Sequence, residues 1–170
     1  MSRAFTIALL IFALLPCAIA QTKPASAEAR LQRLEDLEEI RTVLLDYGRF
    51  LDARDFGSYS RLFAKEGEWV GGFGTVRGPA AIKAFMEKSI PGANTAHNYH
   101  LLSNFEIEVR GDTATAWSRW AFVVPGADNK PSLAQGGHYD DTLIREGGRW
   151  KFKRRVASPD LPSSGPVQTK

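Results

Sequence analysis

The first third of the chain repeats its apolar positions with the period of an α-helix. The positions that share one helical face are Leu37, Ile40, Leu44, Tyr47 and Leu51. They follow one another at steps of three and four, and charged residues fill the opposite side. The pattern predicts a long helix from about Ala27 to Asp52 with this stripe facing the core.

Two shorter helices are expected after it. Asp55 is a suitable N-cap for an apolar segment that we expect to end at Gly67, and Gly78-Pro79 places proline at the first position of another helix. Residues 68–76, between them, alternate loosely and contain glycines, which predicts a short strand or hairpin.

The second half of the chain changes to the two-residue period of β-strands. Segments 100–110, 113–124, 135–146 and 149–157 are rich in β-branched and aromatic residues and are separated by Gly- and Pro-containing turns. Helices followed by an antiparallel meander form an α+β pattern, in which a curved, mostly antiparallel sheet wraps around three helices on one face.

Strand alternation predicts which side chains face the helices. The expected inner set on the second and third long strands is Ala114, Ala116, Ser118, Trp120, Phe122, Gly137, Tyr139, Asp141 and Leu143. Trp117, Arg119, His138 and Asp140 then lie on the outer face.

The first long strand contains an ambiguity. Phe105 and its alternate neighbours face inward, so strict alternation turns His100 outward. A β-bulge near Ser103 and Asn104 would return His100 to the inner face, and would also supply the curvature of the sheet.

The N-terminus is typical of a secretory signal peptide over residues 1–20: an early arginine, an apolar run and a small-residue site ending at Ala20. A retained signal anchor is the alternative, but the run is short for a bilayer span of ~20 residues and Pro16 interrupts it. Lipid attachment at Cys17 is disfavoured by the same proline. Cleavage predicts a secreted or periplasmic protein without cysteine.

Composition is that of an ordinary globular domain. The 170 residues include 22 Lys and Arg against 19 Asp and Glu, a formal charge of +3 without a long basic block, so no nucleic-acid partner is implied. We expect a linker at 21–27, a folded domain at 28–157 and a disordered tail at 158–170. After signal cleavage, no membrane association is expected.

Motifs for nucleophilic serine, zinc, phosphate loops and dinucleotides are absent from the chain after Ala20, so no cofactor is predicted. His97 and His100 are three residues apart, but no helix aligns them and His138 points to the other face. We therefore expect no metal site.

Four segments, taken in order, resemble a known family. They are YGRFLDARDFGSYSRLFAKEGEW at 47–69, GPAAIKAFM at 78–86, HLLSNFEIEVRGDTATAWS at 100–118 and GGHYDDTLIREGGRWKF at 136–152. The chain resembles the SnoaL-like family of the nuclear transport factor 2-like superfamily, which includes scytalone dehydratase and ketosteroid isomerase. The resemblance implies a cone-shaped fold with a mostly apolar pocket, and assembly as a homodimer or homotrimer.

The resemblance carries over only some catalytic residues. Tyr47 matches the oxyanion-stabilising tyrosine of ketosteroid isomerase, but Gly71 stands where that enzyme has its carboxylate base. Asp52 and His100 match scytalone dehydratase, whereas its second histidine is replaced by Trp117 or Ser118.

A carboxylate that holds one imidazole nitrogen fixes the tautomer and leaves the other nitrogen as a base, so Asp52 and His100 are the first candidate catalytic pair. Tyr47 is the candidate oxyanion donor. The remaining candidates would line the pocket and bind substrate, and they are Trp69, Phe85, Ser118, Trp120, Tyr139 and Asp141. The alternatives are helix capping by Asp52, a surface position for His100, core packing of Tyr47, and a buried structural role for Tyr139 with Asp141.

These residues favour an exported protein that binds a small apolar, cyclic molecule. If it is an enzyme, the chemistry is that of a cofactor-independent dehydratase or isomerase. The alternative is a non-catalytic binding or interaction module of the same fold.

Overall fold

The structure is a computed structural model that describes residues 26–72, 74–90 and 97–161. The expected signal peptide, most of the linker and residues 162–170 lie outside the described residues. No helix in the described part is both long and apolar enough to cross a bilayer.

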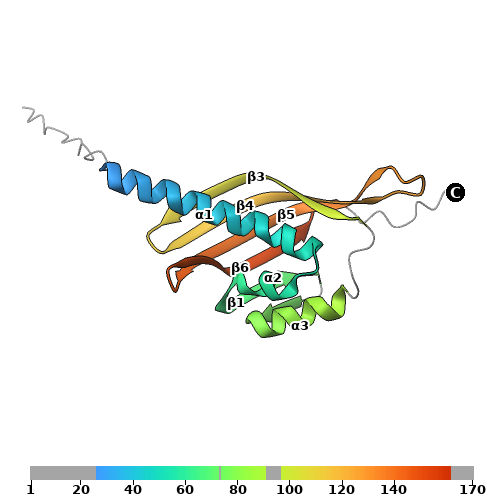
Figure 1. The fold of residues 1–170 in the computed structure, drawn as a ribbon, viewed down its shortest axis with the longest axis horizontal. Helices are drawn as coiled ribbons and strands as arrows, with labels where there is room; N and C mark the ends of the chain where they lie inside the picture. Colours follow the sequence, from blue (N-terminus) through green and yellow to red (C-terminus); the bar gives the residue numbers. More distant parts are fainter. Residues whose placement is uncertain (1–25, 73, 91–96, 162–170) are drawn as a thin grey trace, which may run out of the picture.

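The long helix α1 (Ala27–Asp52) has the bounds that the periodicity predicts. Ser26 caps it by accepting a hydrogen bond from the backbone N–H of Ala29 at 3.2 Å. The apolar stripe is buried from Ile40 onward, with Ile40 and Leu44 fully inaccessible, whereas Leu37 is half-buried. Figure 1 shows α1 lying across one face of the sheet.

The region after α1 differs from the prediction. Helix α2 (Phe56–Arg61) ends before Gly67, and strand β1 (Phe63–Gly71) already contains that glycine. The reason is a tertiary contact: the backbone N–H of Phe152 donates a hydrogen bond to the carbonyl oxygen of Leu62 at 2.8 Å. A Cβ on Gly67 would lie 2.6 Å from the Phe152 carbonyl oxygen, so this glycine permits close strand approach.

The expected hairpin and third helix are confirmed. Strand β1 pairs with β2 (Gly74–Arg77), and α3 (Pro79–Ser89) follows with proline at its start. Gly78 is the N-cap with a φ of 81°, a left-handed conformation that glycine adopts without strain.

Four long strands complete the domain: β3 (Tyr99–Arg110), β4 (Thr113–Pro125), β5 (Pro131–Glu146) and β6 (Arg149–Pro159). The six-stranded sheet has the order β2-β1-β6-β5-β4-β3. The meander β3 to β6 is antiparallel as predicted, whereas β1 joins β6 in parallel and makes the sheet mixed. The α+β fold with a curved sheet around three helices is confirmed.

The C-terminal boundary is a correction to the sequence prediction. Ser158 and Pro159 belong to β6, and the backbone N–H groups of Asp160 and Leu161 both donate to the carbonyl of Gly136. Residues 158–161 are therefore part of the folded body, because backbone hydrogen bonds to β5 outweigh their unfavourable composition.

The sheet faces follow the predicted alternation. Each strongly buried residue of β4 and β5 belongs to the predicted inner set except Gly136, which Leu161 covers. The predicted bulge is also present: the β3–β4 register shifts between Ser103 and Glu106, and Asn104 has a φ of 55°. Two residues of β3 there oppose one residue of β4.

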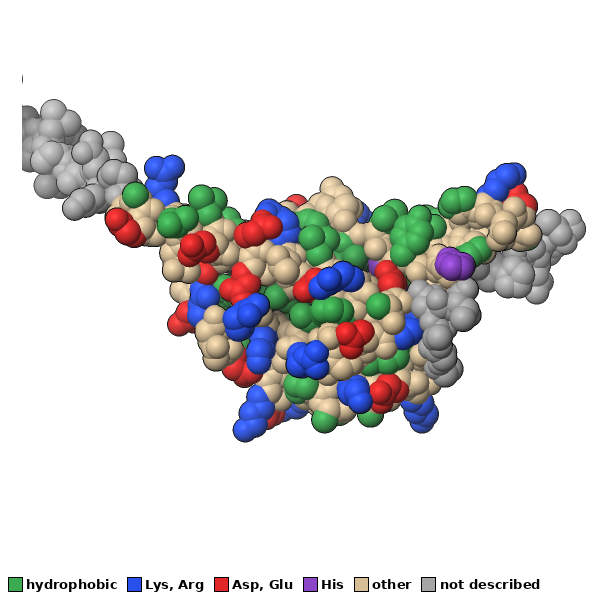
Figure 2. All heavy atoms as spheres, in the orientation of Figure 1, with side chains coloured by type: hydrophobic (Ala, Val, Ile, Leu, Met, Phe, Trp, Pro, Cys, Tyr) green, Lys and Arg blue, Asp and Glu red, His purple; other side chains and the backbone are tan. Residues whose placement is uncertain are grey.

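On the visible face in Figure 2, acidic and basic side chains are interleaved and hydrophobic side chains form separate small patches. This mixture agrees with the small net charge of the sequence.

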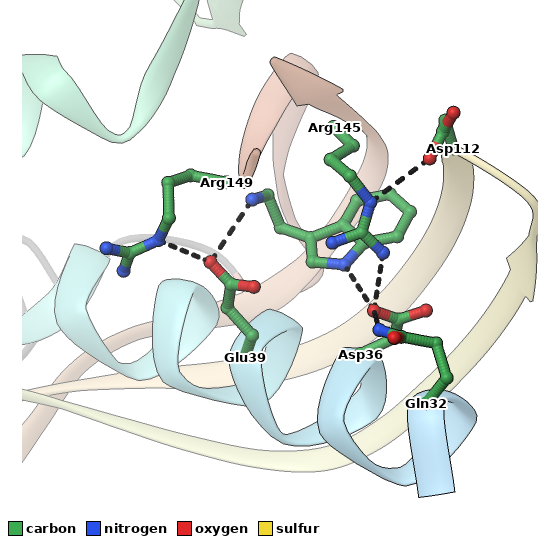
Figure 3. A network of polar contacts seen from close by, with 7 residues as sticks. Gln32, Asp36, Glu39, Asp112, Arg145 and Arg149 are labelled. Carbon is green, nitrogen blue, oxygen red and sulfur yellow. Dashed lines mark hydrogen bonds and ion pairs between the residues drawn. The ribbon is translucent and has the colours of Figure 1, made fainter. Parts of the chain in front are cut away.

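A polar network fixes the N-terminal half of α1 to the sheet (Figure 3). The buried Asp36 carboxylate accepts hydrogen bonds from the guanidinium of Arg145, from the indole of Trp150 at 3.3 Å and from Gln32 at 3.1 Å. Burial raises the pKa of Asp36, but these hydrogen bonds lower it by more, so the pKa lies below its ordinary value. Glu39, one turn further along, accepts from the Nε of Arg149 at 2.6 Å.

Replacement of this carboxylate tests the network. We expect Asp36→Asn to lower the free energy of unfolding by about 1–3 kcal/mol at neutral pH, because charge-assisted hydrogen bonds are weakened. Since the pKa of Asp36 is lower in the folded state, its contribution is complete above about pH 5 and is lost as the pH falls through the folded pKa.

Urea unfolding of both proteins at neutral and acidic pH measures this difference. The difference in the free energy of unfolding between wild type and Asp36→Asn should become smaller at acidic pH. Asp46→Asn is the matched control, since Asp46 pairs with the exposed Arg49 of the same helix and such pairs contribute at most about 1 kcal/mol. A stability difference that is absent at neutral pH, or that is equal at both pH values, would contradict the stabilising role of the Asp36 carboxylate.

Candidate functional site

The structure brings together Asp52 and His100, the first candidate pair. Oδ1 of Asp52 lies 2.6 Å from Nδ1 of His100, and Oδ2 accepts the backbone N–H of His100 at 2.7 Å. The side chains are 17% and 14% exposed, so the pair is sheltered but accessible. Both carboxylate oxygens thus hold one histidine, which orients the ring and assigns Nε2 as the nitrogen that can meet a ligand.

Two local features create this contact. The β3 bulge returns His100 to the inner face, where it is opposite Phe122 of β4. Gly48 then lets α1 approach β3, because a Cβ at that position would be 2.8 Å from Leu102 and 3.6 Å from the Cβ of His100. The last residue of α1 consequently reaches the start of β3.

Two aromatic rings lie beside the imidazole. The ring centroid of His100 is 4.7 Å from that of Phe122 and 6.5 Å from that of Trp120. Trp120 is buried, and its indole N–H donates to the backbone carbonyl of His138 at 3.1 Å. This fixed indole forms an apolar wall beside the candidate base.

Tyr47 lies deeper, on the same helix as Asp52. Its hydroxyl oxygen accepts the indole N–H of Trp69 at 3.0 Å, and Trp69 in turn packs on the half-buried Phe85 of α3 at 5.2 Å. Because the oxygen accepts the indole proton, the Tyr47 O–H can point away from Trp69 toward another acceptor.

Trp69 also explains the glycine at position 71. A Cβ on Gly71 would lie 2.4 Å from Cη2 of the Trp69 ring. The indole therefore occupies the space in which the isomerase resemblance would require a carboxylate base.

A buried ion pair occupies the centre of the inner face. Arg155 donates from Nε and Nη2 to the two oxygens of Asp141 at 2.8 and 2.6 Å, and both side chains are completely buried. Burial alone lowers the pKa of Arg155, but the Asp141 carboxylate raises it above the ordinary value. Asp141, predicted as a substrate ligand, thus has both oxygens engaged in the core.

The guanidinium of Arg155 is enclosed by aromatic rings. Its central carbon lies 4.0 Å from the ring centroid of Tyr47, 4.1 Å from that of Tyr139 and 4.2 Å from that of Phe152. Burial raises the pKa of the Tyr139 hydroxyl well above its ordinary value, so Tyr139 stays neutral. Tyr139 therefore packs around a cation in the core, which is its alternative structural role.

The sequence prediction missed Arg155. Alternation from the buried Trp150 and Phe152 places Arg154 inside and Arg155 outside. A register shift opposite Thr142 and Leu143 inserts one residue in β6 and reverses this assignment. The signal available in the sequence was the inward Asp141, which as a buried carboxylate needs a cation.

The other candidate residues are found as follows. Ser118 is fully buried on the inner face of β4. His97 is exposed, and His138 lies on the outer face with Nδ1 2.7 Å from Asp160. In the described part of the chain no group of three His, Cys, Asp or Glu side chains could hold a metal ion.

Comparison with known structures agrees with this fold. The structure superposes on a nuclear transport factor 2-like protein with a cystatin-like fold from Novosphingobium aromaticivorans, with a TM-score of 0.72, 29% identity and coverage of 81% of this chain and 90% of that one. A proposed scytalone dehydratase from the same organism matches with a TM-score of 0.63 at 22% identity, covering 83% and 99%. The fold is that of the nuclear transport factor 2-like proteins.

The family follows from the sequence matches. Residues 32–156 match the model of the SnoaL-like domain, and the chain belongs to that family. The uncharacterised protein Rv2910c of Mycobacterium tuberculosis is 32% identical over 130 residues, which cover 72% of this chain and 84% of the relative.

Gly71 provides a direct test of the Trp69 position. We expect Gly71→Ala to lower the free energy of unfolding by about 1–3 kcal/mol, because the new methyl group displaces a packed indole. The near-ultraviolet circular dichroism of the tryptophans should change as well. Gly72→Ala is the control, since nothing lies within 4 Å of a Cβ there, and wild-type stability in both variants would disprove the packing argument.

Proposed function

We propose that this SnoaL-like protein binds a small, neutral, apolar cyclic molecule beside His100 and catalyses a cofactor-independent elimination or isomerisation by acid/base chemistry. The observation that carries the proposal is the two-point contact between Asp52 and His100. An imidazole with one nitrogen held by a carboxylate and with aromatic rings beside it has the form of a general base.

Elimination fits these residues better than the isomerase arrangement, because the Trp69 indole occupies the space next to Gly71. In a dehydration, Nε2 of His100 would remove a proton from the carbon next to a carbonyl group. The C–H electron pair then forms the C=C bond, the C–O bond to the leaving hydroxyl breaks, and the protonated imidazole returns the proton to give water. A hydrogen bond from Tyr47 to the carbonyl oxygen would stabilise the charge that develops there.

The resemblance to a proposed scytalone dehydratase supports a dehydration only as an analogy of fold. The aromatic walls formed by Trp120, Phe122 and Trp69 favour a flat, apolar substrate. We also propose that the protein is exported and acts after cleavage of the N-terminal segment.

A non-catalytic ligand-binding module is the second candidate function. The dehydratase resemblance requires a second histidine on β4, but the residue that points inward there is Ser118. The absence of a histidine at this position favours binding without catalysis.

The proposal is tested with 3-hydroxycyclohexanone, a β-hydroxy ketone whose dehydration to cyclohexenone is followed by ultraviolet absorbance. We expect the wild type to accelerate this reaction and His100→Gln to reduce kcat/KM by about 10²–10⁴-fold, the usual contribution of a general base. Asp52→Asn should cause a smaller loss, because it disturbs only the orientation of the ring.

His138→Gln is a matched control. His138 also has an aspartate at Nδ1, but its side chain lies on the outer face, so turnover should be unchanged. Undiminished turnover by His100→Gln would refute the catalytic role. Binding of the ketone without turnover by the wild type would instead favour the second candidate.

A further inference from the structure

One nitrogen of the buried Arg155 guanidinium takes no part in the core ion pair. Nε and Nη2 donate to Asp141, whereas Nη1 has no hydrogen-bond partner among the described residues, although the side chain is completely buried. An arginine side chain carries only donors, and a charged donor left unpaired in a core lowers stability. Because buried polar groups are almost always paired, Nη1 indicates an acceptor that the described residues do not supply.

A second buried donor lies near Arg155. The hydroxyl oxygen of the fully buried Tyr59 has no hydrogen-bond partner in the described part of the chain. The ring centroid of Tyr47 lies 4.8 Å from that of Tyr59 and 4.0 Å from the guanidinium carbon of Arg155. Burial and, next, the neighbouring Tyr47 phenol raise the pKa of Tyr59 well above its ordinary value, so Tyr59 keeps its proton. Donors from Arg155, Tyr59 and Tyr47 therefore lie close together.

Aromatic contacts connect these donors with the candidate base. The ring centroid of Tyr139 lies 4.1 Å from the guanidinium carbon of Arg155 and 5.8 Å from the ring centroid of Trp120. The Trp120 ring in turn lies beside that of His100, at 6.5 Å between centroids. An aromatic surface thus extends from the candidate base to the guanidinium.

Helix α1 gives the length of this region. Tyr47 packs on the guanidinium and Asp52 holds His100, and the two positions are about 7.5 Å apart along the helix axis. The donors and the base are therefore within reach of one small cyclic molecule.

The charge balance selects the kind of acceptor. Asp141 already neutralises Arg155, and both side chains are completely buried. A further anion would leave an unpaired negative charge among aromatic rings, which is costly. A neutral oxygen acceptor satisfies the donors without adding charge.

We propose that Nη1 of Arg155 and the hydroxyl of Tyr59, together with Tyr47, form a binding subsite for the carbonyl oxygen of a neutral cyclic ketone. This subsite rests on the proposed function, because its ligand is the ketone on which His100 acts. The guanidinium adds a charge-assisted hydrogen bond, which strengthens as negative charge develops on the oxygen during proton removal. Asp141 is a positioning residue, since it fixes two nitrogens of the guanidinium and leaves Nη1 to the ligand.

Cyclohexenone tests the subsite apart from turnover, because it has the carbonyl group but no hydroxyl group to eliminate. Calorimetric titration compares it with cyclohexene, the hydrocarbon that lacks the oxygen. We expect the wild type to bind the ketone about tenfold more tightly or better, as a hydrogen bond to a charged donor contributes. The infrared C=O stretch of the bound ketone should lie at a lower wavenumber than in water.

Tyr59→Phe removes one donor and keeps the aromatic ring. We expect it to bind cyclohexenone roughly three- to tenfold more weakly and to bind cyclohexene as the wild type does. The free protein should unfold at the wild-type temperature or above, because the lost hydroxyl has no partner among the described residues. Tyr99→Phe is the matched control, since Tyr99 is an exposed tyrosine, and its ketone affinity should be unchanged.

The guanidinium is best removed together with its counter-ion. In the double variant Asp141→Leu/Arg155→Met, apolar side chains replace a buried ion pair, a change that cores often tolerate. The affinity for cyclohexenone should fall about tenfold or more, and the C=O stretch should move to a higher wavenumber. Circular dichroism checks the fold, and Tyr59→Phe decides alone if the double variant does not fold.

Equal affinity of the wild type for the ketone and the hydrocarbon would overturn the subsite, as would an unchanged C=O stretch in the variants. Tighter binding of cyclohexenecarboxylate than of cyclohexenone would overturn the neutral class of ligand. A lower unfolding temperature of free Tyr59→Phe would show that a resident water satisfies this hydroxyl, and would overturn its role. His100→Gln should keep ketone binding and the C=O stretch, so an absence of turnover contradicts the proposed function and not the subsite.

Discussion

Two carboxylates of α1, Asp36 and Asp52, fix that helix to the sheet at points about 24 Å apart along its axis. Asp36 is held by Arg145 and Trp150 of β5 and β6, and Asp52 by His100 of β3. One contact is to the central strands and the other to an edge strand of the same sheet, so the helix cannot rotate or slide without losing one of them. The position of Tyr47, which lies between them, and the geometry of the candidate base both follow from this constraint.

Local sequence signals predict most of the fold, because the helices and turns concerned are formed by residues that are close together in the chain. The apolar stripe gave α1 its bounds, and proline after glycine gave the start of α3. The errors concern contacts between distant parts of the chain. Gly67 was expected to end a helix, but the parallel approach of β6 makes it part of β1, and hydrogen bonds to Gly136 hold residues that composition assigns to a disordered tail.

The two bulges of the sheet show why the site was only partly predictable. In β3, an inward His100 requires a bulge near Ser103, and the structure has it. In β6, the inward Asp141 indicates that a cation is needed in the core, but alternation alone selects Arg154, and only the register shift turns Arg155 inward and Arg154 outward. Alternation assigns side chains to a face of the sheet only as far as the next bulge. The pairing of β6 with β5 is therefore needed to place the charged Arg155 in the core.

The two histidine–aspartate pairs of this chain show that the surroundings of a pair decide its chemistry. His138 on the outer face has carboxylates at both nitrogens, Asp160 at 2.7 Å and Asp140 at 3.3 Å, and Arg119 also binds Asp160. With both nitrogens engaged, its ring joins Asp160, which follows β6, to β5 and has no nitrogen to offer a substrate. His100 has its carboxylate at Nδ1 and ring contacts to Phe122 and Trp120. Of these two pairs, the one at His100 has a single carboxylate at the ring and aromatic neighbours, which is the arrangement that proton removal from a carbon acid requires.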